Sequence, residues 1–301
     1  MVRALFQSGH EVAHVHLGHV HSNVCGPMEV TSLGKNCYFC TLIDDKTQLI
    51  WFHPCKSKSS FTPWFIHMDK LFANQYGTHV KILRSNGGGE YVNTVLCEYC
   101  GENGICIELT VPHMPEQNSV AKRTNQKILD KGRTIMKDAR APDFLWAKAF
   151  TTTVYAINRT ISANSGGVTP FKVFSSWKPD IGHMRVWYSD VFTHQPKELG
   201  SRKLGERGHL VKFLGYPKES SGYKVYEPTT HEVYIVCKPV FREEAQSSRP
   251  TTFESTSDNS EPDENPDQNE GDALSNSPSI TPTTPIPSSS PPIIPAPTRP
   301  T

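Results

Sequence analysis

The chain has 301 residues, long enough for about two domains of roughly 150 residues each. Its formal net charge is only +1, from 31 Lys and Arg against 30 Asp and Glu, so the chain as a whole is not strongly basic. The charge is unevenly spread, because residues 246–301 hold 8 acids and 2 bases, a net charge of −6. Residues 1–245 then hold 29 bases and 22 acids, a net charge of +7. We therefore expect a basic, folded body that carries an acidic tail.

The distribution of apolar residues excludes two classes of protein. No run of 18 or more apolar residues occurs, so a membrane-spanning helix is not expected. The N-terminus lacks the apolar stretch of a secretory signal. We therefore expect an intracellular protein with reduced thiols, in which the 8 cysteines form no disulfide framework.

The first half of the chain alternates between strand and helix patterns. Residues 1–20 are rich in His and show no apolar pattern. β-Branched and aromatic runs predict strands, and apolar residues three or four positions apart predict helices. In chain order the predicted elements are a strand over 37–43, its hairpin partner over 48–52, a helix over 59–76 capped by Ser59 or Ser60, a strand over 80–83, a short helix over 93–101, a strand over 105–111, and helices over 119–139 and 142–158. This order is typical of a mixed α/β layer domain.

The second half changes character after residue 185. Short apolar and aromatic runs at about ten-residue spacing predict a small all-β barrel or sheet. The runs cover 186–188, 190–193, 209–215, 222–226 and 232–236. The tail from 246 to 301 holds 12 of the 24 prolines and almost no aromatic residue, so we expect it to be disordered.

Four stretches carry a family resemblance. They are HSNVCGPM (21–28), LRSNGGGEY (83–91), ELTVPHMPEQNSVAKRTN (108–125) and FLGYPKESSGYKVYEP (213–228). Together and in this order they resemble the integrase of copia-type retrotransposons over about residues 21–245. The resemblance implies a fragment of a Pol polyprotein with a ribonuclease-H-like core (21–180) and an SH3-like barrel (185–245), between a His-rich lead (1–20) and the tail. It also implies a nuclear location.

The same resemblance points to a catalytic triad that this sequence lacks. Family members cut and join DNA with three carboxylates that hold two Mg²⁺ ions. The matching positions here are Asn23, Asn86 and Lys122, with 62 and 35 intervening residues, which is the spacing of the family. An amide is a neutral ligand, and a charged Lys has no lone pair to offer. We therefore expect no Mg²⁺ cofactor and no enzymatic activity.

The predicted helix over 119–139 is rich in Lys and Arg. Such a face is either solvated or turned toward nucleic acid, and the resemblance favours DNA. Gln117 and Asn118, just before it, either contact DNA or cap the helix. The predicted nucleic-acid-binding residues are Gln117, Asn118, Lys122, Arg123, Lys127 and Lys131. The expected partner is DNA, bound weakly and without sequence preference. A homodimer is a further option, whereas no membrane and no small-molecule substrate is expected.

Two groups of residues raise the question of a transition-metal site. Cys37 and Cys40, like Cys97 and Cys100, are spaced as in zinc knuckles, but a strand and a helix favour small buried thiols. His10, His14, His16, His19 and His21 form a cluster near the N-terminus. It is either a stray metal site or a remnant of the zinc module that precedes the core in the family.

Three hypotheses on function remain. The leading one is a degenerate integrase, folded, inactive and still able to bind nucleic acid. The second is a protein-interaction module that dimerises with active integrases or inhibits them. The third is a relic without function.

Overall fold

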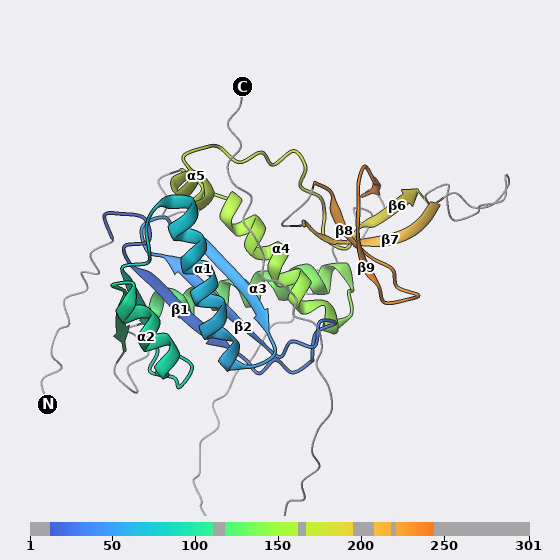
Figure 1. Cartoon of the computed structure of the whole chain (residues 1–301). Helices are drawn as coiled ribbons and strands as arrows, with labels where there is room; N and C mark the ends of the chain where they lie inside the picture. Colours follow the sequence, from blue (N-terminus) through green and yellow to red (C-terminus); the bar gives the residue numbers. More distant parts are fainter. Residues whose placement is uncertain (1–12, 111–117, 162–166, 195–207, 218–220, 244–301) are drawn as a thin grey trace, which may run out of the picture.

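The computed structural model describes residues 13–110, 118–161, 167–194, 208–217 and 221–243 (Figure 1). Within these ranges the chain forms a mixed α/β domain and then an all-antiparallel β sheet. No helix in the described ranges is long and apolar enough to cross a membrane. The tail from 246 to 301, for which we expected disorder, lies outside the described residues.

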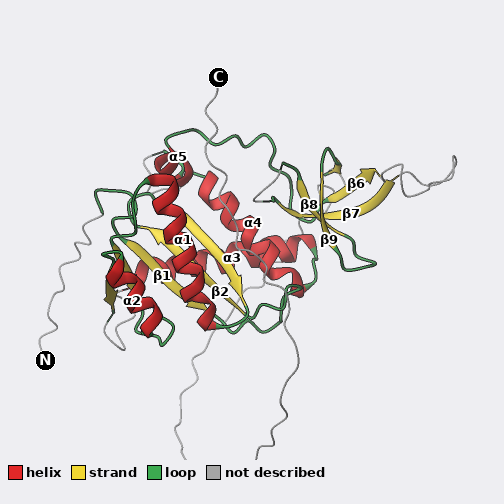
Figure 2. Ribbon diagram, in the orientation of Figure 1, coloured by secondary structure: helices red, strands yellow, loops and turns green. Residues whose placement is uncertain are grey.

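The first sheet has five strands in the order β3-β2-β1-β4-β5. Figure 2 shows strands of this sheet in yellow among the helices, with β1 and β2 labelled. β1 pairs antiparallel with β2 and parallel with β4, so the sheet is mixed, as the sequence predicts. β2 and β3 form the predicted hairpin, and β4 and β5 are parallel. The strands are β1 (Val20–Cys25), β2 (Tyr38–Asp44), β3 (Ile50–Cys55), β4 (Ile82–Ser85) and β5 (Cys106–Leu109).

Helices cover both faces of this sheet. α1 (Phe61–Tyr76) and α2 (Thr94–Glu102) pack on one face, where Phe65 and Phe72 are fully buried. Asn93 caps α2, since its side-chain oxygen accepts from the Leu96 N–H at 3.0 Å. Ser60 does occupy the N-cap of α1, as predicted, but its side chain makes no capping bond.

α3 (Ser119–Ala139) and α4 (Trp146–Arg159) pack on the opposite face, and α5 (Pro170–Ser175) follows them. The observed bounds of α3 are those predicted from its spacing of apolar residues. α3 and α4 approach closely at Gly132, where an added Cβ would lie 2.3 Å from Cδ1 of Phe150. A glycine is therefore required at this crossing.

The central strand β1 was not predicted, and the expected patternless lead over 1–20 is wrong for its described part. The Leu17 side chain is fully buried, and its N–H donates to Asp44 Oδ1 at 2.8 Å. The strand itself buries two polar residues, His21 and Ser22, which broke the apolar pattern that marks a strand in the sequence. Tertiary contacts satisfy them, for example the 3.0 Å hydrogen bond between Ser22 Oγ and the Tyr91 hydroxyl.

The second sheet has the order β10-β6-β7-β8-β9, and all its pairs are antiparallel. Its small hydrophobic core consists of four buried residues, Val191, Val211, Phe213 and Val225. Its strands are β6 (Asp190–His194), β7 (Gly208–Gly215), β8 (Tyr223–Tyr226), β9 (Val233–Val236) and β10 (Val240–Arg242).

One prediction for this region is wrong, and one strand was not predicted. Residues 186–188 are not a strand. Trp187 is buried there as an anchor, and its indole N–H donates to the Leu214 carbonyl at 3.1 Å. β10 was not predicted, because its three residues are too few to form a pattern. The Thr152 hydroxyl of α4 also donates to Leu214, at 3.0 Å, so this stretch joins the β sheet to the α/β domain.

Candidate nucleic-acid interface

Two of the three family triad positions lie side by side. Asn23 is on β1, and Asn86 directly follows the parallel neighbour β4. The side-chain amide of Asn86 donates a hydrogen bond to the side-chain oxygen of Asn23 at 3.3 Å. Asn23 is half-buried and Asn86 is exposed, so the pair is open to solvent on one side. The fold thus unites two positions 63 residues apart in the sequence.

The third position, Lys122, lies in the first turn of α3 and is exposed. Two hydrogen bonds fix this end of α3 against the sheet. The Asn118 side-chain amide donates to the Ser22 carbonyl at 3.0 Å, and the Thr41 hydroxyl donates to Asn125 Oδ1 at 2.9 Å. Lys122 therefore lies in a helical turn that these two hydrogen bonds hold against β1 and β2.

The residues at these three positions do not fit a magnesium site. Mg²⁺ takes hard oxygen ligands and is usually held by carboxylates. Here one amide uses its N–H to bind the oxygen of the other, and both groups are neutral. The third position supplies a cation instead of an anion. The described geometry offers no carboxylate from any of the three.

The predicted basic residues of α3 are exposed, but they do not share one face. Lys131 is nine residues from Lys122, which places the two about 180° apart around a helix of 3.6 residues per turn. Lys127 and Lys131 line a cavity of about 640 Å³ together with Arg185 and Trp187. Partial burial, and secondarily the charge of Lys131, lowers the pKa of Lys127. Lys122 and Arg123 lie nearer the start of α3, which the Asn118 side chain attaches to β1, the strand that carries Asn23.

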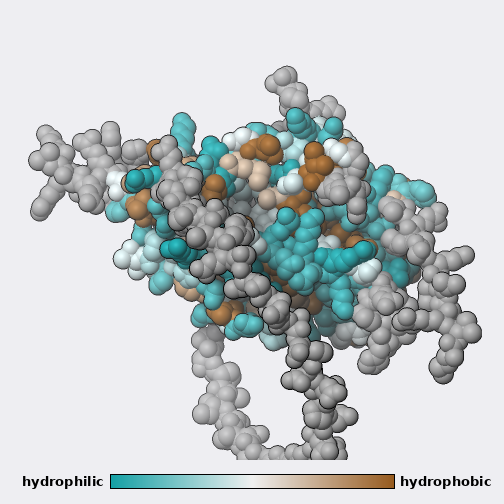
Figure 3. Space-filling view, turned by 180° about the vertical axis from the view of Figure 1, so that it is seen from behind, coloured by the Kyte–Doolittle hydropathy of each residue, from teal (hydrophilic) through white to brown (hydrophobic). Residues whose placement is uncertain are grey.

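Figure 3 views the molecule from behind, where the residues not drawn in grey are mostly hydrophilic, with hydrophobic ones gathered in a few places.

Asn118 occupies the N-cap position of α3, one of the two roles expected for it, but its side chain makes no capping hydrogen bond. The residue is only 6% exposed, and its side-chain amide donates to the Ser22 carbonyl of β1. Its role in the described structure is to attach the helix to the sheet. Gln117 lies outside the described residues.

The cysteine pairs do not form zinc knuckles. Cys40 Sγ lies 3.4 Å from Cys55 Sγ, whereas Cys37 Sγ lies 3.5 Å from the Thr31 hydroxyl. Cys40 and Cys100 are buried, as predicted, whereas Cys37 is only half-buried and Cys97 is exposed, so the interpretation as buried thiols is wrong for Cys97 and holds only in part for Cys37.

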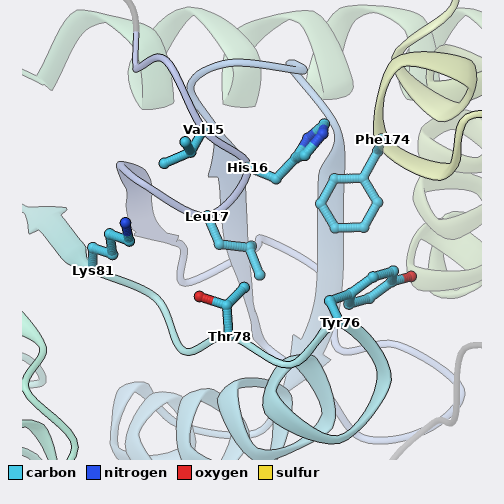
Figure 4. A pocket seen from close by; sticks show the side chains of 7 residues that line it. All are labelled: Val15, His16, Leu17, Tyr76, Thr78, Lys81 and Phe174. Atoms are coloured by element: carbon cyan, nitrogen blue, oxygen red, sulfur yellow. The ribbon is translucent and has the colours of Figure 1, made fainter.

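The histidine cluster divides into separate environments. His16 packs edge-on against Phe174, with ring centroids 5.6 Å apart. It lines a cavity of about 390 Å³ with Val15, Leu17, Tyr76, Thr78, Lys81 and Phe174 (Figure 4). His19 and His21 instead stack on each other and meet Asp45, which directly follows β2. His10 lies outside the described residues.

Comparison with known proteins supports the same family throughout. Residues 189–255 match the family described as the retroviral polymerase SH3-like domain. The chain is 36% identical over 241 residues to the "Retrovirus-related Pol polyprotein from transposon TNT 1-94" of Nicotiana tabacum, which covers 80% of this chain and 18% of that protein. It is 29% identical over 198 residues to the "Retrovirus-related Pol polyprotein from transposon RE1" of Arabidopsis thaliana, covering 66% of this chain and 13% of that protein.

A similarity to a yeast relative is also present. The "Truncated transposon Ty1-A Gag-Pol polyprotein" of Saccharomyces cerevisiae is 26% identical over 149 residues, covering 49% of this chain and 12% of that protein. The chain thus spans less than a fifth of the length of these relatives, at 18%, 13% and 12%.

This chain joins a mixed α/β domain to an antiparallel SH3-like domain. It is therefore related to the integrase region of retrotransposon Pol polyproteins. Within that class, the resemblance of this chain to a copia-type integrase fragment is confirmed.

Proposed function

We propose that this chain is a catalytically inactive, ribonuclease-H-like integrase core with an SH3-like barrel, and that it keeps a weak, non-specific affinity for DNA in the nucleus. The observation that carries this proposal is the hydrogen bond from Asn86 to Asn23 at the position where the family places two metal-binding carboxylates. The mixed sheet, with β4 and β5 parallel to β1, supports the ribonuclease-H-like assignment.

Charge is the main reason to expect inactivity. Three carboxylates supply −3, whereas two amides and one ammonium group supply +1, so the site differs by +4. A cation 4 Å from a unit positive charge is repelled by about 4 kcal/mol for each unit of its own charge at the effective dielectric near a protein surface. Two Mg²⁺ ions that bridge attacking and leaving oxygens would find no compensating anion among these three residues.

A strand-transfer assay with Mg²⁺ tests the inactivity. The unmodified chain should show no activity above background, whereas the triple variant Asn23→Asp, Asn86→Asp and Lys122→Glu restores the ligand charges and should gain activity. Asn74→Asp and Lys137→Glu, both at exposed positions, make the same kinds of change away from the site and should remain inactive. Magnesium-dependent strand transfer by the unmodified chain would refute the proposal.

A gel-shift series over salt concentration tests the DNA binding. Each phosphate contact contributes about 0.9 to the slope of log K against log salt. Lys122→Ala with Arg123→Ala, near the start of α3, should reduce the slope by about 1 to 2. The matched double variant Lys127→Ala with Lys131→Ala, at residues further along α3 that line the cavity beside Arg185 and Trp187, should reduce it less. If the unmodified chain has no salt-dependent affinity, the binding part of the proposal fails.

One observation favours the second hypothesis, an assembly module. Phe192, Leu210 and Val240 are exposed and directly opposite one another in a row across β10, β6 and β7. Exposed apolar groups in contact often mark a protein interface. Sedimentation analysis should then show self-association that Phe192→Ser reduces, and addition of the chain to an active homologue should inhibit strand transfer. A chain that stays monomeric and does not inhibit would exclude this role.

A further inference from the structure

A second group of metal-ligating side chains lies at the other end of β1 from Asn23. His19 directly precedes β1, and His21 is the second residue of the strand, so both side chains leave the same face of the sheet. Asp45 directly follows β2, and its N–H donates to the His19 carbonyl at 2.9 Å. Strand pairing therefore holds the three side chains together, and their position does not depend on a loop.

The distances among these side chains suit a tetrahedral metal ion. One ligand atom from each of His19, His21 and Asp45 can be chosen so that all lie within 4.8 Å of one another. His21 Nε2 lies 3.2 Å from Asp45 Oδ1. Bonds of about 2.0–2.1 Å to zinc in tetrahedral geometry separate neighbouring ligand atoms by about 3.3–3.4 Å. The observed separation is already close to that value.

A fourth ligand is available from the edge strand. The backbone register places His21 beside Arg84 of β4, and Arg84 beside Glu108 of β5. Glu108 Oε2 lies 3.5 Å from His19 Nε2, again near the edge length of the tetrahedron. The Glu108 side chain is 41% exposed, so it can adjust to an ion and forms the open side of the group.

One nearby cation competes for that fourth ligand. Arg84 Nη1 lies 3.7 Å from Glu108 Oε2. It therefore offsets part of the charge of Glu108, whereas the Asp45 Oδ2 accepts from the Ala13 N–H at 3.0 Å. That hydrogen bond orients Asp45 in the way that outer partners orient metal ligands.

We propose that His19, His21 and Asp45, with Glu108 as fourth ligand, form a zinc-type metal site that ties β1 to the end of β2 and to the edge strand β5. Two imidazole nitrogens with carboxylate oxygens suit Zn²⁺ better than Mg²⁺ or Ca²⁺, which prefer oxygen ligands alone. The site is separate from the triad positions of the family and requires none of them. Because the ion bridges three strands, its binding should raise the stability of the fold.

The test is a calorimetric titration of Zn²⁺ into the full chain, prepared without a histidine tag and stripped of metal. We expect one zinc ion per chain. The affinity should be at least 10-fold weaker in His19→Gln, which changes the more exposed of the two histidine ligands. His209→Gln changes an exposed histidine on β7 in the other domain and should bind as the unmodified chain does. Zinc should raise the melting temperature of the unmodified chain and of His209→Gln more than that of His19→Gln.

Further measurements separate this site from other ligands. The metal-free melting temperature shows whether His19→Gln folds, and Glu108→Gln provides a second variant with a partly exposed ligand that should weaken zinc several-fold. Co²⁺ in place of zinc should give the visible spectrum of a tetrahedral nitrogen and oxygen site without a thiolate band. Equal zinc affinity in His19→Gln and the unmodified chain, a thiolate band, or displacement of zinc by equimolar Mg²⁺ would each overturn the proposal.

Discussion

The side-chain amide of Asn158, on α4, makes two hydrogen bonds with the backbone of Ile50, the first residue of β3. Its oxygen accepts from the Ile50 N–H at 3.0 Å, and its nitrogen donates to the Ile50 carbonyl at 2.8 Å. β3 is an edge strand, so this amide takes the place of a neighbouring strand at that point. The two residues are 108 positions apart, and Asn158 is buried.

The variant Asn158→Ala should therefore be clearly destabilised. It leaves a buried backbone N–H and carbonyl without their side-chain partner, which costs about 1–3 kcal/mol for each unsatisfied group. Chemical denaturation should show a lower free energy of unfolding, by about 2–4 kcal/mol. Gln126→Ala removes an exposed amide that bonds Asp130 at 2.8 Å and should change stability by less than about 0.5 kcal/mol. Equal effects in the two variants would contradict the role of Asn158.

At the crossing of α3 and α4, the change Gly132→Ala should lower the free energy of unfolding, although Ala usually favours a helix. In an exposed helix Ala is about 1 kcal/mol better than Gly. At Gly132 the new methyl group would lie 2.3 and 2.4 Å from two carbons of the Phe150 ring, so we expect a net loss of about 1–3 kcal/mol. Gly101→Ala, on α2 with no atom within 4 Å of the added Cβ, should be neutral or stabilising in the same denaturation series. A stabilised Gly132→Ala would mean that the helices do not pack as described.

The Asn23–Asn86 contact predicts how the stability of the chain changes when aspartates replace these two residues. Asn23→Asp with Asn86→Asp replaces a hydrogen bond of 3.3 Å by two like charges, so without metal the double variant should lose about 1 kcal/mol of stability, since solvent screens this open pair. Thermal melts should show that Mg²⁺ restores this loss in the double variant and has no such effect on the unmodified chain. A melting temperature that does not respond to Mg²⁺ would indicate that the scaffold no longer brings the two positions together.

The lowered pKa of His183 predicts that the fold loses stability when the pH falls. Burial, and next the charges of Arg159 and Arg185, lower the pKa of His183 below its ordinary value of 6.5, whereas the nearby Asp180 opposes this shift. The unfolded chain then binds the proton more readily, so the contribution to stability is complete above pH 6.5 and is lost as the pH falls below it toward the folded-state pKa. His183 Nε2 also lies 2.6 Å from the Tyr155 hydroxyl.

Free energies of unfolding measured at pH 7.5 and 5.5 check this prediction. The decrease between the two pH values should be smaller in His183→Gln than in the unmodified chain. His209→Gln, at an exposed histidine, should keep the full decrease. An unchanged pH dependence in His183→Gln would show that protonation of His183 is not coupled to folding.

Much of the fold follows from local pattern, and the exceptions have a physical cause. α3 begins and ends where the apolar spacing predicts, because one face of the helix is apolar and the other is charged. β1 was missed because its buried side chains include His21 and Ser22, whose partners Asp45 and Tyr91 are distant in sequence. Trp187 was taken for a strand residue because an aromatic anchor and an aromatic strand have the same composition.

The sequence by itself determined the family and the mixed α/β class, and it has two amides and a lysine where the resemblance implies the triad carboxylates, since these depend on residue identity and spacing along the chain. Only the tertiary structure decided that Asn23 and Asn86 bond to each other and that Asn118 serves the fold. It also brought His19 and His21 to Asp45 and Glu108. These relationships arise from strand register and helix rotation, which place side chains in space and leave no trace in local composition.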